Sequence, residues 1–253
     1  MKNLNSLLTL LFLICFTAFT QAQSANLDSA KNKIINAKAL IGAWTTSYLN
    51  DQQQEVTLTI IITEKHFAQT AYNVKEKRFD ETFGGTWNLD RNNFIFQYEF
   101  SSKDASKVGE NAKFKVEING NTLSMGNKNI LWTKLDNGNK SDLTGAWLFA
   151  TNKPDSQARR GEKEERKTMK ILSDTRFQWI AYHTGTGEFL ATGGGTYTAE
   201  NGKYTENIEF FSRNKDRVGA SLSFEYEVKN DDWHHSGLNS SGEPLYEIWT
   251  LRK

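Results

Sequence analysis

The sequence predicts an all-β protein that contains two copies of one antiparallel domain. The first observation is a motif that occurs twice, Leu-Ile-Gly-Ala-Trp at residues 40–44 and Leu-Thr-Gly-Ala-Trp at residues 143–147. The second is a constant register, because residues 67–118 can be laid over residues 177–228 without a gap. The third is a series of short β-branched and aromatic runs separated by turn residues. Coincidences of this kind indicate a duplicated domain.

The two copies set the expected domain boundaries. In the shared register Phe67 falls on Phe177, and Tyr72 falls on Tyr182. Each copy closes with Trp-Thr. The polar, glycine-containing stretch between the copies is typical of a linker. The expected segments are a leader at residues 1–22, a lead-in at 23–39, the first domain at 40–135, the linker at 136–142 and the second domain at 143–253.

The first residues are typical of a secretory signal peptide. Lys2 precedes a short apolar run, and Ala22 supplies the small residue at the expected cleavage point. The apolar run is too short to span a bilayer, so no transmembrane segment is expected after cleavage. Cys15, the one cysteine of the chain, lies inside this run. The mature protein is therefore expected to be secreted or periplasmic and to contain no disulfide.

A short amphipathic helix is expected at residues 23–39, because Leu27, Ile34 and Ile35 alternate with lysines. From residue 43 onward the pattern is β, with strands expected at residues 56–63, 67–72, 85–89, 94–100, 114–118 and 129–135. Asn119-Gly120 predicts a two-residue hairpin. Short strands at this spacing, with few helical segments, indicate an antiparallel architecture.

The second copy is longer than the first in two places. One excess falls within residues 153–167 and the other within residues 231–244. Insertions within a repeat usually form loops, so we expect both to be loops.

The charge balance excludes an electrostatic partner. Lys and Arg together number 31 and Asp and Glu number 30, and one of the basic residues is Lys2 of the leader. A neutral mature chain has no basic surface for nucleic acid or for an anionic membrane. The sequence predicts no oligomeric state.

The Gly-x-Trp motifs resemble the opening of lipocalins and related calycin barrels. The resemblance rests on Gly42, Trp44, Gly145 and Trp147, and it covers nearly all of the mature chain. It looks closer still to short lipocalin-like domains of secreted Bacteroidetes proteins, which share the Leu-x-Gly-x-Trp opening. The resemblance implies two tandem up-and-down β-barrels, in each of which the tryptophan closes the floor. It also implies that a basic side chain from the last strand stacks on that tryptophan, and the candidates are Lys134 and Arg252.

Strand alternation indicates which side chains could line a ligand pocket. In the second copy Phe177, Trp179 and His183 share one face, whereas Ile180 and Tyr182 share the other. Aromatic side chains with a few polar groups suit a pocket for a small apolar or amphipathic molecule, and they equally suit a packed core. The candidate ligand-binding residues are Phe67, Tyr72, Trp87, Phe177, Trp179, Tyr182, His183 and Tyr197.

The glycine runs at residues 84–85 and 193–195 are interpreted as bends at which a strand coils to close a barrel. They do not resemble phosphate-binding loops, because no Lys-Ser/Thr follows them. No cofactor, metal site or catalytic residue is predicted. His234 and His235 point to opposite faces if they lie on a strand, so both could bind one ion only from a loop.

Three functions remain open on the sequence alone. An eight-stranded barrel is wide enough either to fill itself with side chains or to hold one small ligand. We expect a non-enzymatic binding protein, with the second copy as the better candidate. The alternative is an interaction module with filled barrels, in which Trp233 and the loop at residues 153–167 bind a protein or glycan. An enzyme that acts inside a barrel is the third alternative.

Overall fold

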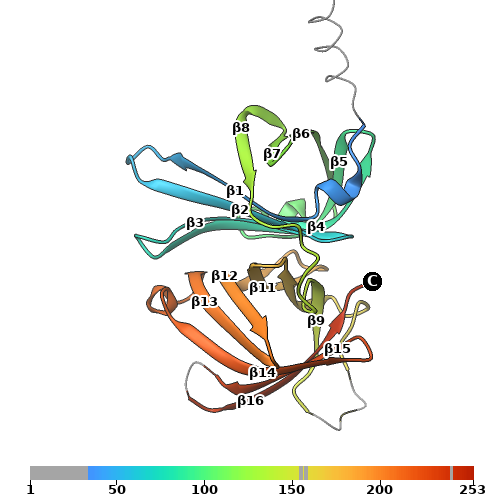
Figure 1. Ribbon diagram of the computed structural model, residues 1–253, viewed down its shortest axis with the longest axis vertical. Helices are drawn as coiled ribbons and strands as arrows, with labels where there is room; N and C mark the ends of the chain where they lie inside the picture. The colour runs from blue at the N-terminus through green and yellow to red at the C-terminus, as the bar shows by residue number, and fades with distance from the viewer. Residues whose placement is uncertain (1–33, 154–155, 157–158, 240–241) are drawn as a thin grey trace, which may run out of the picture. The chain divides into compact units, whose positions relative to one another are not determined.

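The computed structural model confirms the predicted fold class. It describes residues 34–153, 156, 159–239 and 242–253, and residues 36–253 form one compact unit. This unit contains two closed antiparallel barrels in tandem, each of eight strands that pair in chain order (Figure 1). Two such barrels fit a lipocalin-like or calycin-type fold. Within the described residues no helix has the length and apolar character needed to cross a membrane.

Barrel 1 comprises the strands of the first copy. They are β1 (Gly42–Leu49), β2 (Glu55–Ile62), β3 (His66–Asn73), β4 (Arg78–Asp90), β5 (Asn93–Ser101), β6 (Asn111–Asn119), β7 (Thr122–Met125) and β8 (Asn127–Lys134). Pairing of β1 with β8 closes the barrel, with Trp44 opposite Lys134. Two 3₁₀ turns, η1 (Ala37–Ala39) and η2 (Ala105–Lys107), accompany these strands.

Barrel 2 repeats this arrangement. Its strands are β9 (Gly145–Thr151), β10 (Arg166–Leu172), β11 (Arg176–His183), β12 (Phe189–Glu200), β13 (Lys203–Phe211), β14 (Ser221–Lys229), β15 (Asp232–Leu238) and β16 (Pro244–Leu251). β16 pairs with β9 to close the barrel. The 3₁₀ turn η3 (Lys215–Arg217) follows β13, as η2 follows β5.

The glycine runs lie where the fourth strand of each barrel bends. The pairing of β4 with β5 shifts register between Gly84 and Gly85, and that of β12 with β13 shifts between Gly194 and Gly195. A Cβ on Gly85 would lie 2.0 Å from the Gln97 carbonyl oxygen, and a Cβ on Gly195 would lie 2.1 Å from the Asn207 carbonyl oxygen. The interpretation of these runs as bends is confirmed, because only glycine allows so close a backbone approach.

Two local predictions need correction. The hairpin turn between β6 and β7 is formed by Gly120 and Asn121, because Asn119 pairs with Thr122 and so belongs to the strand. Residues 231–244 were expected to form a loop, but residues 232–238 form β15, which pairs with β16. The excess residues lengthen this hairpin in barrel 2 and place Trp233 and His235 on a strand.

The beginning of the chain lies mostly outside the described residues. The expected signal peptide at residues 1–22 falls there, as does most of the helix expected at residues 23–39. Of that helix, the structure describes only its end, where η1 forms a single turn capped by Asn36.

Candidate functional site

The two barrels contact each other through a repeated pair of hydrogen bonds. The Tyr72 hydroxyl donates to Glu209 Oε2 at 2.7 Å, and the Tyr182 hydroxyl donates to Glu99 Oε2 at 2.6 Å. The repeat aligns Tyr72 with Tyr182 and Glu99 with Glu209. The two bonds are therefore equivalent, and each barrel supplies the donor of one and the acceptor of the other. Each barrel therefore uses the same surface toward the other, as the two subunits of a symmetric dimer do.

The core between the barrels is formed by outward-facing side chains. It contains Ile61 and Phe100 of barrel 1 together with Leu148, Ile180 and Tyr182 of barrel 2. The predicted ligand residues Tyr72 and Tyr182 thus lie between the barrels instead of inside one. Burial raises the pKa of both phenols, and the neighbouring carboxylates raise it further. Both hydroxyls remain protonated donors, which gives them a structural role in this contact.

Arg252 joins the same contact instead of stacking on Trp147. Its guanidinium donates two hydrogen bonds to Glu99, both at 2.8 Å, and two to Glu162, at 2.6 and 2.8 Å. Burial alone would raise the pKa of Glu99, but the bonds from Arg252 hold it at about 2. In barrel 1 the basic side chain does stack on the tryptophan, as the resemblance to lipocalins implied. Lys134 Nζ lies 5.0 Å from the centroid of the Trp44 ring.

Four predicted aromatic residues have their polar atoms bonded to nearby backbone. Trp44 Nε1 donates to the Leu40 carbonyl, and Trp147 Nε1 donates to the Leu143 carbonyl, each at 2.8 Å. Trp87 Nε1 and the Tyr197 hydroxyl likewise donate to backbone carbonyls, at 2.9 and 2.6 Å. These bonds satisfy each donor within the protein, so none of the four polar atoms is left for a ligand.

The described interior of barrel 1 contains a group of packed aromatic rings. Phe67 packs edge-on against Phe94 and Phe96, with ring centroids 5.3 and 4.9 Å apart. Phe83 and Phe114 pack against the same group. Rings at these separations form a close-packed apolar core.

The interior of barrel 2 contains a buried ion pair. Lys170 Nζ donates to Glu206 Oε1 at 2.9 Å, and the two side chains are only 6% and 7% exposed. The Tyr204 hydroxyl donates to the same carboxylate oxygen at 2.9 Å. Lys170 Nζ also lies 4.8 to 5.2 Å from three ring centroids, those of Trp233, Trp249 and Tyr204. The ammonium is thus enclosed by π-systems on the sides that Glu206 leaves open.

A histidine and a second carboxylate extend this group. His235 Nδ1 lies 3.2 Å from Glu247 Oε2, and Trp249 Nε1 donates to the same oxygen at 3.0 Å. Burial lowers the pKa of His235, and the charge of Lys170 lowers it further, so the imidazole is neutral at pH 7. Burial raises the pKa of Glu247, but the bond from His235 and the charge of Lys170 bring it below the usual value. We call Lys170, Tyr204, Glu206, His235 and Glu247 the polar cluster.

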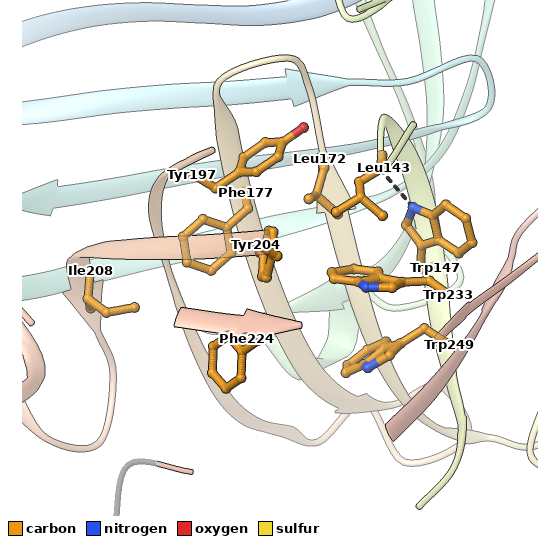
Figure 2. Close-up of a cluster of buried hydrophobic side chains, with 10 residues drawn as sticks. All are labelled: Leu143, Trp147, Leu172, Phe177, Tyr197, Tyr204, Ile208, Phe224, Trp233 and Trp249. Atoms are coloured by element: carbon orange, nitrogen blue, oxygen red, sulfur yellow. Dashed lines mark hydrogen bonds between the residues drawn. The ribbon is translucent and has the colours of Figure 1, made fainter. Parts of the chain in front are cut away.

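Two polar atoms beside this cluster have no hydrogen-bond partner. They are Nε1 of Trp233, whose residue is 0% exposed, and Nε2 of His235, whose residue is 2% exposed. Figure 2 shows the Trp233 indole between those of Trp147 and Trp249, with centroid separations of 5.9 and 6.1 Å. Buried polar atoms are nearly always bonded, so a pair of unbonded atoms on one strand is unusual.

The opposite end of barrel 2 from Trp147 is lined by half-buried apolar side chains. Phe149, Trp179, Phe211, Leu222 and Leu245 pack against the buried core without being covered themselves. Trp179 packs edge-on against Phe211, with centroids 5.4 Å apart, and Arg160 lies 5.4 Å from the Phe149 ring. We call these five side chains the mouth of barrel 2. It brings the predicted residue Trp179 close to the polar cluster, with Phe177 in the core below.

His183 and Trp233 lie elsewhere than their predicted roles require. His183 ends β11 at the rim, where its Nε2 is 3.9 Å from Glu165 and its Nδ1 accepts from the Thr186 amide. Trp233 is fully buried, so it cannot be the exposed contact residue of an interaction module. The reason is the lengthened β15, whose alternation turns Trp233 and His235 inward and His234 outward, toward the Tyr246 hydroxyl at 2.7 Å.

A metal site and an open groove beside barrel 1 are the other candidate features of the described residues. Among the described residues no group of three or more His, Cys, Asp and Glu side chains could hold a metal ion. An open groove of about 820 Å³ lies outside barrel 1, beside His66, Trp87, Glu99, Glu162 and Arg252. Within it Arg252 is bonded to both Glu99 and Glu162, so these three side chains bind one another. Barrel 2 therefore offers the better site.

Sequence reasoning missed most of the polar cluster, although the repeat contained the signal. In the shared register Lys170, Tyr204 and Glu206 fall on Ile60, Phe94 and Phe96 of barrel 1. The pairing of β14 with β15 likewise places Trp233 and His235 on Leu123 and Met125. Polar residues at positions that are apolar in the other copy would have marked this interior.

The comparisons with known proteins concern barrel 2. No curated protein matches the chain. Residues 142–250 match the family described as a domain of unknown function (DUF4488). The matched range begins just before Leu143 and ends within β16, so it is barrel 2 that is similar to this family.

Proposed function

We propose that the protein is an exported, non-enzymatic binding protein that holds one small, partly apolar molecule in barrel 2. Barrel 1, whose interior is apolar at the equivalent positions, acts as the structural partner. The observation that carries the proposal is the exchange of an apolar interior for the polar cluster at equivalent positions of the same fold. Barrel 1 acts as an internal control for what the fold itself requires.

The energetics support this assignment. The free-energy cost of desolvating two charges often exceeds the Coulombic attraction between them. A buried ion pair therefore commonly stabilises a protein no more than apolar side chains of similar volume do. The unbonded Trp233 and His235 atoms add a desolvation cost of about 1–3 kcal/mol each. Barrel 1 closes with Ile60 and Phe96 and bears no such cost. A polar interior that stability does not require is typical of a binding site.

The composition of the site indicates the character of the ligand. The mouth supplies apolar contact area, and the polar cluster supplies a few fixed polar groups beneath it. Ligand pockets of this kind are mostly apolar, with a small number of polar atoms that fix orientation. A molecule with an apolar body and one polar end suits this arrangement.

Binding without turnover is proposed in preference to catalysis. His235 and Glu247 form the hydrogen-bonded pair that could orient a general base. Catalysis would also require a positioned nucleophile or a group that stabilises developing charge. Lys170, the cation of the cluster, is already bonded to Glu206 and enclosed by three rings. We therefore assign the cluster to recognition.

Native mass spectrometry of the protein purified from its own host tests the function. We expect one small molecule per chain under gentle conditions and its loss on denaturation. Incubation with the recovered molecule should return it unchanged. A bare protein mass would contradict the binding role, and a chemically altered molecule would contradict the non-enzymatic role. The intact denatured mass tests export, because cleavage near Ala22 predicts the loss of the leader.

A further inference from the structure

We infer that the ligand of barrel 2 is an uncharged alcohol or phenol whose hydroxyl group bonds to both Trp233 and His235. This inference rests on the proposed function and specifies the polar end of the ligand. It starts from the two unbonded buried atoms, Nε1 of Trp233 and Nε2 of His235. Both side chains project from β15 into barrel 2, two residues apart and therefore on the same face of the strand.

The two atoms have opposite hydrogen-bonding roles. An indole Nε1 carries a hydrogen and can only donate. His235 Nδ1 faces the Glu247 carboxylate, which accepts and does not donate, so the imidazole proton lies on Nδ1. Nε2 of the neutral ring is then an acceptor. The site thus presents one donor and one acceptor to the interior.

A single hydroxyl group satisfies both atoms. Its oxygen accepts from Trp233, and its hydrogen is donated to His235. An oxygen about 2.9 Å from each of two nitrogens can bridge atoms up to about 6 Å apart. The two rings are neighbours in the structure, with centroids 5.4 Å apart. An ether, ketone or ester cannot donate, and an ammonium group cannot accept.

Charge excludes an anionic ligand. Among the residues that the structure describes, the ionised groups that face the interior are Lys170 from β10, Glu206 from β13 and Glu247 from β16. Two carboxylates against one ammonium give the polar cluster a net negative charge, and the further cation, Arg160, lies at the mouth, 5.4 Å from the Phe149 ring. A ligand carboxylate would add a further negative charge in a poorly solvated site and would lack the hydrogen that His235 needs. A fatty acid is therefore disfavoured, and a neutral hydroxyl compound is favoured.

Matched naphthalene probes test this inference. Equilibrium dialysis at neutral pH would measure binding of 2-naphthol, 2-methoxynaphthalene and 2-naphthoate to the full-length mature protein. The three share one apolar body, and only 2-naphthol can both donate and accept while uncharged. We expect 2-naphthol to bind about tenfold more tightly than the methoxy compound, and the carboxylate to bind most weakly.

Two variants test whether Trp233 and His235 cause the preference for 2-naphthol. Trp233→Phe and His235→Met should each reduce the preference for 2-naphthol over the methoxy compound to less than about threefold. Trp249→Phe is the matched control, because its Nε1 already bonds to Glu247. It should retain the preference even if all probes bind more weakly. Trp233→Phe breaks no protein hydrogen bond, so its thermal unfolding should show a folded protein.

The outcomes separate this inference from the proposed function. Equal binding of 2-naphthol and 2-methoxynaphthalene would overturn the hydroxyl inference and leave a binding role standing. Preferred binding of 2-naphthoate would overturn the charge argument. A preference that survives in both Trp233→Phe and His235→Met would place the hydroxyl elsewhere and also overturn the inference. Failure of all three probes to bind would overturn it too, while the native mass spectrum decides the binding role separately.

Discussion

Lys170 Nζ lies 2.9 Å from Glu206 Oε1 inside barrel 2, at two positions where barrel 1 has Ile60 and Phe96. One fold therefore carries two different interiors within a single chain. The apolar interior shows what the barrel needs in order to close. The polar interior shows what has been added, and the predictions below separate these two contributions.

The first prediction concerns the ion pair itself. Single exchanges, Lys170→Ile or Glu206→Phe, leave one buried charge without its partner and should lower the free energy of unfolding by about 3–5 kcal/mol. The double exchange restores the pair of residues found in barrel 1. The double exchange also leaves the Tyr204 hydroxyl without its acceptor, at a cost of about 1–3 kcal/mol, so the double variant should be close to the wild type in stability and more stable than either single variant. Urea unfolding of the three variants measures this, and a double variant less stable than either single variant would contradict the account.

The second prediction concerns pH. Burial and the nearby Arg252 lower the pKa of His66 to about 4, against 6.5 in the unfolded chain, while Glu99 and Glu162 oppose the shift. The unfolded state therefore binds more protons between these values, and stability should fall as the pH falls from 6.5 toward 4. The loss amounts to about 3 kcal/mol. Above pH 6.5 His66 should contribute nothing to the pH dependence of stability.

A His66→Gln variant tests the assignment of this pH dependence. Its stability should change less than that of the wild type between pH 6.5 and pH 4.5, with the lowered pKa of His235 accounting for part of what remains. Below pH 4.5 both proteins should lose stability together, because Glu99 takes up a proton at its ordinary pKa in the unfolded chain, whereas its pKa in the folded protein is about 2. Identical curves for the two proteins above pH 4.5 would refute the role of His66.

The third prediction concerns the contact between barrels. Tyr72→Phe and Tyr182→Phe each remove a hydroxyl that donates to a carboxylate, at 2.7 and 2.6 Å. Each should cost about 1.5–3 kcal/mol in chemical denaturation. Tyr48→Phe is the control, because this residue is 50% exposed and should change stability by less than about 0.5 kcal/mol. Equal effects at all three positions would show that the repeated bonds do not stabilise the contact.

The fourth prediction concerns the bend in β12. A Cβ on Gly195 would lie 2.1 Å from the Asn207 carbonyl oxygen, which is backbone and cannot move aside. Gly195→Ala should therefore destabilise barrel 2 by more than about 3 kcal/mol, beyond the range of most substitutions. Gly161→Ala provides the matched control, because its nearest neighbour would be a Glu164 side-chain oxygen at 3.9 Å. Thermal unfolding distinguishes the two, and a tolerated Gly195→Ala would contradict the described close approach.

The sequence predicted the architecture well because each strand pattern was present twice. The alternation of Phe177 and Trp179 against Gln178 and Tyr182 also separated two faces of β11 correctly. It did not show which face is inside, because both faces are buried. The outward face packs against barrel 1, where Tyr182 bonds to Glu99. This face therefore lacks the exposed polar side chains that usually identify the outer face of a barrel strand.

The site was harder to predict than the fold. Lys170 follows Arg166 and Lys167, and a lysine in such a run normally indicates an exposed position. Its partner Glu206 is 36 residues away, so no local spacing connects them. Trp233 and His235 were assigned to a loop, because the excess length of the second copy was interpreted as an insertion between strands. Only comparison of the two copies position by position would have shown the polar interior.

The most direct test of the binding role compares ligand occupancy in two proteins expressed in the native host. These are the wild type and the Lys170→Ile/Glu206→Phe double variant, purified in parallel and analysed by native mass spectrometry. The account predicts one bound small molecule per wild-type chain and a bare but folded double variant. A bare wild type, or a double variant that keeps the same molecule at the same occupancy, would contradict the assignment of barrel 2 as the binding site.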